Sequence, residues 1–189
     1  MEFATDRTIK VQEILHDDKW VKAEIVDVLF NNGKEIRNFL RITSKSGGYI
    51  MIIARLVDGR FILTRQCRPV AGMSVEGVAG GREYGEGWIA AGLREMNEEI
   101  GYKPNKLVSL GVHFYPLTDR CDNPCHIFLA MDCVPVENRV KGDEVQGLEA
   151  VLVSKKEVLE MIADGRIKDL ATLAGILGHL AIEGGQLSE

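Results

Sequence analysis

Residues 80–102 read GGREYGEGWIAAGLREMNEEIGY, and this stretch carries most of the information about the fold and the chemistry of the chain. Between residues 88 and 100, apolar side chains recur at helical spacing, which predicts an amphipathic helix with one buried face. The residues expected on that face are Ile89, Leu93, Met96 and Ile100. Gly101 follows directly and is a typical stop signal, so the expected helix ends there.

Three glutamates lie close together on the expected helix, away from its apolar face. Glu95, Glu98 and Glu99 fall within about 100° of one another, since each helical residue advances by about 100°. Like charges at this spacing repel, and acidic residues near a helix C-terminus oppose its dipole. One interpretation is a solvated acidic surface. The other is a site for a hard divalent cation such as Mg²⁺, which also binds phosphate oxygens.

The neighbouring residues leave both interpretations open. Arg94 lies four residues before Glu98, so it could orient that carboxylate or form an ordinary surface ion pair. The segment from Val70 to Gly87 is rich in glycine. Such a segment suits a loop whose backbone approaches a ligand closely, or a flexible connection.

The rest of the chain reads as a mixture of strands and helices. Strands are expected near residues 9–15, 20–30, 36–43, 49–56, 106–114, 126–133 and 148–153. Asp58-Gly59 is a hairpin signal between residues 51–57 and 60–64. Helices are expected at residues 155–163 and 170–182. This order predicts an α/β (α+β) fold in which helices cover both faces of a mixed β-sheet.

The composition is that of an ordinary globular protein. With 189 residues, of which 46% are hydrophobic, the chain is expected to form one domain. Its 23 Lys and Arg against 28 Asp and Glu give a net charge of -5, which argues against nucleic acid as a partner. No apolar run is long enough for a membrane helix, and the first residues do not resemble a signal peptide. We therefore expect a cytoplasmic protein that does not bind membranes.

Four cysteines are expected to be reduced thiols: Cys67, Cys121, Cys125 and Cys133. Cys121, Cys125 and His126 are spaced loosely like zinc ligands, but a clear second ligand pair is missing. Packing within strands and loops is the favoured interpretation of these three residues.

The spacing of residues 80–102 resembles the Nudix box, the signature of hydrolases that cleave a nucleoside diphosphate linked to another moiety. Gly80 is followed after five residues by Glu86, and after seven more by Arg94-Glu95-Met96. One residue later comes Glu98-Glu99, and one residue after that Gly101-Tyr102. Tyr102 departs from the family pattern, which usually has an aliphatic residue there.

The flanking segments are similar to the ADP-ribose and ADP-sugar pyrophosphatase subgroup of that family. The similar segments are Arg65-Gln66-Cys67-Arg68-Pro69, Glu76-Gly77-Val78-Ala79-Gly80, Pro116, Lys19-Trp20-Val21-Lys22 and residues 164–169. Leu117 follows Pro116, where the subgroup usually has glycine. This departure keeps another nucleoside diphosphate derivative open as the substrate.

The resemblance implies a Nudix-type α/β/α sandwich with a mixed sheet and an additional N-terminal antiparallel sheet. It further implies that residues 1–189 form a single Nudix domain. Within it, about residues 1–45 would be a β-rich dimerisation region, and about residues 46–189 the catalytic core with the box at residues 80–102. A homodimer is expected.

The resemblance also implies a metal site built from the box. The expected ligands are Glu95, Glu98, Glu99 and the backbone carbonyl of Ala79, with Glu98 acting as a ligand or as a proton acceptor. Arg94 would orient Glu98. Glu144 is the candidate for a separate general base, although a charged turn explains it equally well.

Four further residues are candidates for substrate binding. Arg68, and with it Arg65, would bind phosphate through the guanidinium group. By resemblance, Trp20 would stack on the nucleobase, and Phe39 could contribute the opposite side of the same clamp. Each of them could instead be a core, interface or exposed strand residue.

The implied activity is Mg²⁺-dependent hydrolysis of ADP-ribose or a related nucleoside diphosphate sugar, a small-molecule substrate. The products would be a nucleoside monophosphate and a sugar phosphate, and Mn²⁺ could replace Mg²⁺. Alternative substrates are a GDP-sugar, NADH or a dinucleotide. A non-catalytic sensor of nucleotide sugars is a further alternative, which the presence of all three box glutamates disfavours.

Overall fold

The computed structural model describes residues 7–83, 85–138 and 147–185. The chain divides into two compact units, which are described separately. Unit 1 contains Met1–Gly48 and Tyr115–Asn123, and unit 2 contains Tyr49–Phe114 and Pro124–Glu189. In the described residues, no helix is both long and apolar enough to cross a membrane.

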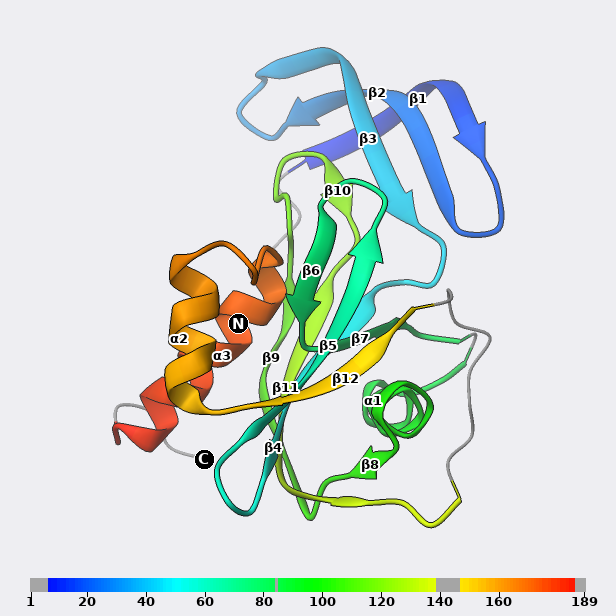
Figure 1. Ribbon diagram of the computed structural model, residues 1–189. Coiled ribbons are helices and arrows are strands. Elements are labelled where there is room, and N and C mark those ends of the chain that lie inside the picture. The colour runs from blue at the N-terminus through cyan, green and yellow to red at the C-terminus, as the bar shows by residue number, and fades with distance from the viewer. Residues whose placement is uncertain (1–6, 84, 139–146, 186–189) are drawn as a thin grey trace. The chain divides into compact units, whose positions relative to one another are not determined.

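Unit 1 is a small, curved β-sheet (Figure 1). In the described residues its order is β1 (Arg7–Asp17), β2 (Val21–Phe30), β3 (Glu35–Ser44) and β10 (Cys121–Asp122). The first three strands pair antiparallel, as expected, whereas the short β10 adds to β3 in parallel. Gly33, at φ +81°, closes the turn between β2 and β3, a conformation that glycine adopts without steric cost.

Unit 2 is built on a mixed sheet with the central order β12-β5-β4-β11-β8. Its strands are β4 (Tyr49–Leu56), β5 (Phe61–Arg68), β6 (Gly72–Glu76), β7 (Val78–Gly81), β8 (Tyr102–Lys103), β9 (Lys106–Phe114), β11 (Cys125–Pro135) and β12 (Glu149–Val153). β11 runs parallel to β4, while the other pairs in this sheet are antiparallel.

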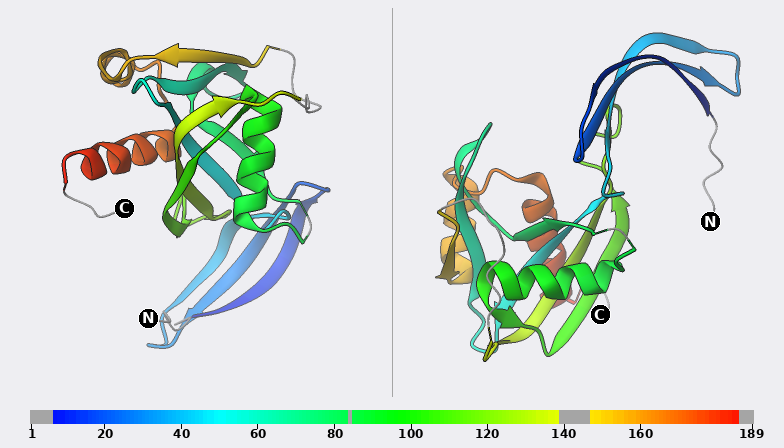
Figure 2. Two further views of the ribbon diagram at one scale, coloured as in Figure 1. Left: turned by 90° about the horizontal axis from the view of Figure 1, so that it is seen from below. Right: turned by 90° about the vertical axis from the view of Figure 1, so that its right-hand side faces the viewer.

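Helices cover both faces of this sheet (Figure 2). On one face lies α1 (Trp88–Glu95), continued by the π-helical turn η1 (Met96–Ile100). On the other lie α2 (Lys155–Ala163) and α3 (Leu170–Glu183). The predicted fold class, a mixed sheet between two helical layers with an additional N-terminal sheet, is confirmed.

Alternation along the central strand β4 builds two separate cores. Ile50 and Ile52 pack with residues of α1 and η1, while Met51 and Ile53 pack with residues of α2 and α3. Successive side chains of a strand point to opposite faces, so a fully buried strand contributes to both layers. This explains why residues 49–56 are apolar almost throughout.

The predicted buried face of the box helix is wrong in part. Met96 and Ile100 are buried, but Ile89 is 59% exposed and Leu93 is 43% exposed. Small residues occupy the contact instead, and a Cβ at Gly92 would lie 3.2 Å from Ile52 Cδ1. The helix therefore approaches the sheet closely along Gly92, and this leaves the larger apolar side chains outside the contact.

The glycine-rich segment before this helix is more ordered than a loop. Much of it forms β6 and β7, which pair with β5 and β4. Gly77, between the two strands, donates its N–H to Thr172 Oγ1 at 3.0 Å, which ties the junction to α3. A Cβ at Gly77 would lie 2.7 Å from the carbonyl oxygen of Ile52, so this close approach requires glycine.

Candidate active site

Two glutamates of the box helix point inward against strand β7. Glu95 is 8% exposed and Glu99 is 5% exposed, although carboxylates are rarely buried without partners. Glu99 Oε2 accepts a hydrogen bond from the N–H of Ala79 at 3.3 Å. The carboxylate of Glu95 lies over Gly80, where any Cβ would overlap it. The expectation that these glutamates lie away from the buried face is therefore wrong.

Arg94 connects the carboxylates of the box. Its Nε and Nη2 donate to the two carboxylate oxygens of Glu86, each at 3.0 Å. Its Nη1 donates to Glu95 Oε1 at 2.8 Å and to Glu98 Oε2 at 3.2 Å, and its Nη2 also donates to the carbonyl of Gly81 at 2.9 Å. One guanidinium thus bonds both the glycine-rich loop and the end of the helix, and Glu98 is among the carboxylates that it contacts.

This arrangement shifts the protonation equilibria of its members. The hydrogen bonds that Arg94 donates to Glu86 raise the pKa of Arg94 above its ordinary value, with burial acting in the opposite direction. Conversely, the hydrogen bonds from Arg94 lower the pKa of Glu86, against the effect of its own burial. Both groups are therefore charged at neutral pH.

The chemistry of the donor set suits a hard divalent cation. Glu95, Glu98 and Glu99 offer carboxylate oxygens, the ligands that Mg²⁺ and Mn²⁺ prefer. The absence of a side chain at Gly80 provides the space in which the Glu95 carboxylate lies. Among the residues that the structure describes, no group of three or more Asp, Glu, His or Cys side chains is arranged to hold a metal ion. Two of the box glutamates, Glu95 and Glu98, are instead bonded to Arg94.

The loop between β7 and α1 is held by the same residues. Arg82 donates from Nε to the carbonyl of Glu86 at 3.0 Å, and its guanidinium lies 4.2 Å from the centre of the Trp88 ring. Glu86 Oε2 also accepts from the N–H of Glu83 at 3.0 Å. The carboxylate of Glu86 therefore accepts hydrogen bonds both from the loop and from Arg94 on the helix.

A family model described as NUDIX domain matches residues 48–173, which includes the whole of this site. The chain belongs to the NUDIX family. The predicted family and its enzyme class, a Nudix pyrophosphohydrolase, are thereby confirmed. Residues 80–102, which resemble the Nudix box, lie wholly within the matched range.

Relatives extend the similarity over nearly the whole chain. An ADP-ribose pyrophosphatase of Bacillus subtilis (strain 168) is 29% identical over 177 residues, 93% of each chain. A methanol dehydrogenase activator of Bacillus methanolicus is 27% identical over 90% of each chain. A solved structure described as an ADP compounds hydrolase matches with a TM-score of 0.76 at 20% identity, covering 99% of this chain and 100% of that one.

Of the two predicted phosphate-binding arginines, one lies on the Nudix-box face of the sheet. Arg68 shares its face of β5 with Ile62, which packs against the box helix. Arg65, three residues earlier, is on the opposite face and forms an ion pair with its cross-strand neighbour Glu149. An odd spacing of three residues within one strand accounts for their opposite faces.

Glu76 is a residue of this region that the sequence analysis did not single out. It is 4% exposed, and its Oε2 accepts from Arg68 Nε at 2.9 Å and from Nη2 at 2.7 Å. The only signal for it was its place in the segment that precedes the Nudix box.

The predicted base-stacking residues belong to unit 1. Trp20 precedes β2, is 65% exposed, and has Lys19 Nζ 4.5 Å from its ring centre. Phe39 is in β3, with the Arg120 guanidinium 5.7 Å from its ring centre. Glu144, the predicted general base, lies outside the described residues.

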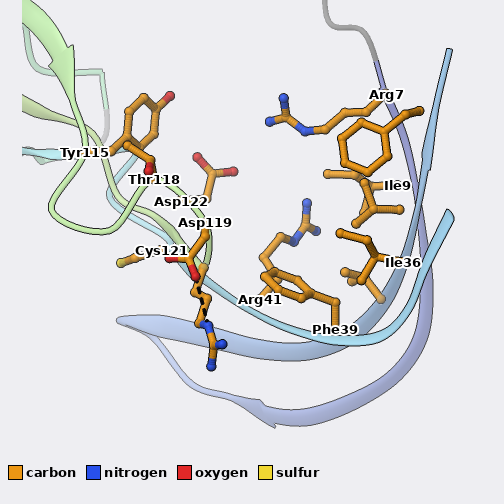
Figure 3. Close-up of a pocket in the computed structure, with 14 residues that line it drawn as sticks. Arg7, Ile9, Ile36, Phe39, Arg41, Tyr115, Thr118, Asp119, Cys121 and Asp122 are labelled. Atoms are coloured by element: carbon orange, nitrogen blue, oxygen red, sulfur yellow. Dashed lines mark hydrogen bonds and ion pairs between the residues drawn. The ribbon is translucent and has the colours of Figure 1, made fainter. Parts of the chain in front are cut away.

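Unit 1 contains a pocket of about 520 Å³ that the sequence did not predict (Figure 3). Its apolar lining includes Ile9, Ile36 and Phe39. Figure 3 shows Arg7 and Arg41 on one side of it, with Tyr115 and Asp122 opposite. Arg41 is held by Glu24, to which it donates from Nη2 at 2.6 Å.

The residues with loosely zinc-like spacing are separated by the fold. Cys125 and His126 are consecutive in β11, so they face opposite layers. His126 stacks on Phe128 with ring centres 4.0 Å apart and shares a hydrogen bond of 2.7 Å with Ser109. Burial raises the pKa of Cys125 to about 12, which keeps this thiol protonated.

Proposed function

We propose that this Nudix enzyme hydrolyses the pyrophosphate bond of ADP-ribose or a related nucleoside diphosphate sugar with the help of Mg²⁺. The products are a nucleoside monophosphate and a sugar phosphate. The observation that carries the proposal is the burial of Glu95 and Glu99 against Gly80 and Ala79, at the positions of a complete Nudix box. The similarity to an ADP-ribose pyrophosphatase over 93% of both chains supports the substrate class.

In this proposal the metal ligands are Glu95, Glu98, Glu99 and the carbonyl of Ala79. A bound Mg²⁺ would lower the pKa of a coordinated water and neutralise charge that develops on the phosphates. Arg94 keeps Glu98 oriented, so that this carboxylate is able to accept a proton from the attacking water. Glu144 is the second candidate for the general base.

The chain's own cations are proposed to bind the anionic substrate. Arg68 has the better position for the phosphates, since it lies on the face of β5 that also packs against the box helix. Trp20 is exposed in unit 1 and is proposed to stack on the nucleobase, with Phe39 as a second aromatic candidate.

We also propose that residues 1–45 mediate formation of a homodimer. Val11, Ile14 and Leu15 in β1 and Leu29 in β2 are between 43% and 53% exposed, so this small sheet offers apolar side chains that a second copy of the chain would cover. Light scattering of the purified protein should give twice the chain mass of 20.9 kDa. A paired Ile14→Asp and Leu15→Asp variant should give the monomer mass, and a monomeric parent protein would refute the proposal.

The test of the proposed activity is product analysis with purified protein, Mg²⁺ and ADP-ribose. AMP and ribose 5-phosphate should appear, should disappear with a chelator, and should be lower by about a thousandfold or more in Glu99→Gln. ADP-glucose, GDP-mannose, NADH and diadenosine polyphosphates in parallel reactions identify a different substrate. Tight ADP-ribose binding without turnover in the parent protein would instead indicate a sensor.

A further inference from the structure

The hairpin of β5 and β6 carries a fixed ion pair on the sheet face that packs against the box helix. Arg68 donates twice to a single oxygen of Glu76, from Nε and from Nη2. The side chain of Glu76 is 5% exposed and that of Arg68 is 40% exposed. The carboxylate is therefore buried, while the guanidinium that it holds reaches the surface.

The surroundings of Arg68 reinforce its charge. Burial disfavours the charged guanidinium, but the hydrogen bonds and charge of Glu76 outweigh this effect. The negative charges of Glu99 and Asp169 act in the same direction, so the pKa of Arg68 is raised above its ordinary value. The electrostatic interaction with Glu99 connects this ion pair to the carboxylates of the box.

Glu76 is itself held in place from the C-terminal part of the chain. On one side of it, the N–H of Val75 donates to the carbonyl of Arg166 at 2.9 Å. On the other side, the N–H of Gly77 donates to Thr172 Oγ1 at 3.0 Å. The backbone on both sides of Glu76 is thus bonded to α3 and to the segment just before it, which restricts where its carboxylate can lie.

The same face of the hairpin has two buried polar atoms without a hydrogen-bond partner among the described residues. Gln66 and Ser74 are directly opposite each other in the β5–β6 register, and both share a face with Arg68. Gln66 Nε2 and Ser74 Oγ are buried and make no hydrogen bond with the residues that the structure describes. Buried polar groups normally have partners, so this face suits a polar ligand or ordered water.

We propose that Glu76 is a positioning residue that fixes the guanidinium of Arg68 for the phosphates of a nucleoside diphosphate substrate. Two of the five guanidinium N–H groups are bonded to Glu76, and the other three, which make no hydrogen bond with the residues that the structure describes, are proposed to bind phosphate oxygens. A guanidinium that is held before the substrate arrives loses less conformational entropy on binding. This inference rests on the proposed function, since it assigns Arg68 to the phosphates.

The test is a double-mutant cycle with Glu76→Gln, Arg68→Ala and the combined variant. Glutamine keeps the size of the side chain but removes its charge. Glu76→Gln should raise the KM for ADP-ribose about tenfold and the dissociation constant for inorganic pyrophosphate about fivefold, with kcat changed less than about threefold. In the Arg68→Ala background, the same change should weaken binding by less than about twofold.

The matched control is Asp58→Asn, which removes the charge from another carboxylate–arginine pair, formed with Arg60 at 2.7 Å in the β4–β5 turn. It should leave the KM and the pyrophosphate affinity unchanged. Equal effects of Glu76→Gln with and without Arg68 would overturn the inference, as would an unchanged KM. If the parent protein does not hydrolyse ADP-ribose, the proposed function fails, while the pyrophosphate cycle still tests the role of Glu76.

Discussion

The carboxylate of Glu95 lies over the α-carbon of Gly80, in the space that a side chain at position 80 would occupy. A Cβ there would overlap the carboxylate and would lie 2.6 Å from Glu95 Cγ. Gly80 pairs with Ile50 near the end of β7, and Glu95 is the last residue of α1. The first glycine of the box therefore makes room for one of its own glutamates.

Gly80→Ala should reduce activity much more than stability. The added methyl group expels the end of a flexible side chain, so the backbone is left in place while Glu95 loses its position. We expect kcat to fall by about a hundredfold or more, since small displacements of catalytic groups are costly. The melting temperature should change by only a few degrees, roughly the effect of 1 kcal/mol.

The control for this variant is Gly87→Ala. A Cβ at Gly87 would meet nothing within 4 Å, and its φ of -77° suits any residue. Steady-state kinetics and thermal unfolding of both variants check the prediction. Full activity in Gly80→Ala would show that the position of Glu95 does not matter for turnover.

Arg94→Lys should disrupt both the loop and the box carboxylates. A lysine has a single nitrogen and cannot reproduce the fork that bonds Glu86 through two atoms. We expect a loss of roughly 2 kcal/mol in the free energy of unfolding, measured with urea, because Arg94 is mostly buried. We also expect kcat to fall at least about tenfold, because Glu98 is no longer oriented. Retention of both quantities would contradict the central role of this arginine.

The contribution of Glu86 to stability should depend on pH. Its pKa in the folded protein is lowered from 4.5 by the hydrogen bonds of Arg94, so acid protonates the unfolded state more readily. The stabilisation is therefore complete above about pH 4.5 and declines as the pH falls further. The difference in unfolding free energy between the parent protein and Glu86→Gln should shrink accordingly.

Unfolding with urea from pH 7 to pH 3 measures this difference. Glu160→Gln is a suitable control, since its ion pair is weak. The side chain of Glu160 is 54% exposed on α2, and its Oε1 lies as far as 3.8 Å from Lys156 Nζ. Its effect on stability should be small throughout this range. A Glu86→Gln penalty that is the same at pH 3 as at pH 7 would be inconsistent with the predicted linkage.

Gly175→Ala should destabilise unit 2 without altering the active site directly. A Cβ at Gly175 would lie 2.5 Å from Ile53 Cγ1 and 3.2 Å from Ile127 Cγ2, so α3 would have to move away from the sheet. Overpacking of this kind costs about 1–3 kcal/mol. Urea unfolding of Gly175→Ala and of Leu177→Ala, a change at a 56% exposed position of the same helix, would show whether the close approach matters.

Much of the fold followed from local patterns. The hairpin at Asp58-Gly59, the helices near residues 155–163 and 170–182, and the mixed sheet were all predicted with small errors at their ends. These elements have regular periodicity and strong turn or capping signals, such as the capping box of Ser154 and Glu157. The prediction of a loop was wrong at β6 and β7, where the glycine-rich segment forms strands. The low strand propensity of glycine is overridden there because the backbone approaches β4 and α3 closely.

The sequence by itself determined the family, the identity of the box residues and the layered architecture, because spacing and alternation are properties of the chain alone. Only the tertiary structure decided which way the side chains of the box helix point. Small Gly92 lets the helix approach the sheet, so Glu95 and Glu99 are buried while Ile89 and Leu93 are exposed. The ion pair of Arg68 and Glu76 was likewise visible only in the structure, because the two residues meet when β5 pairs with β6.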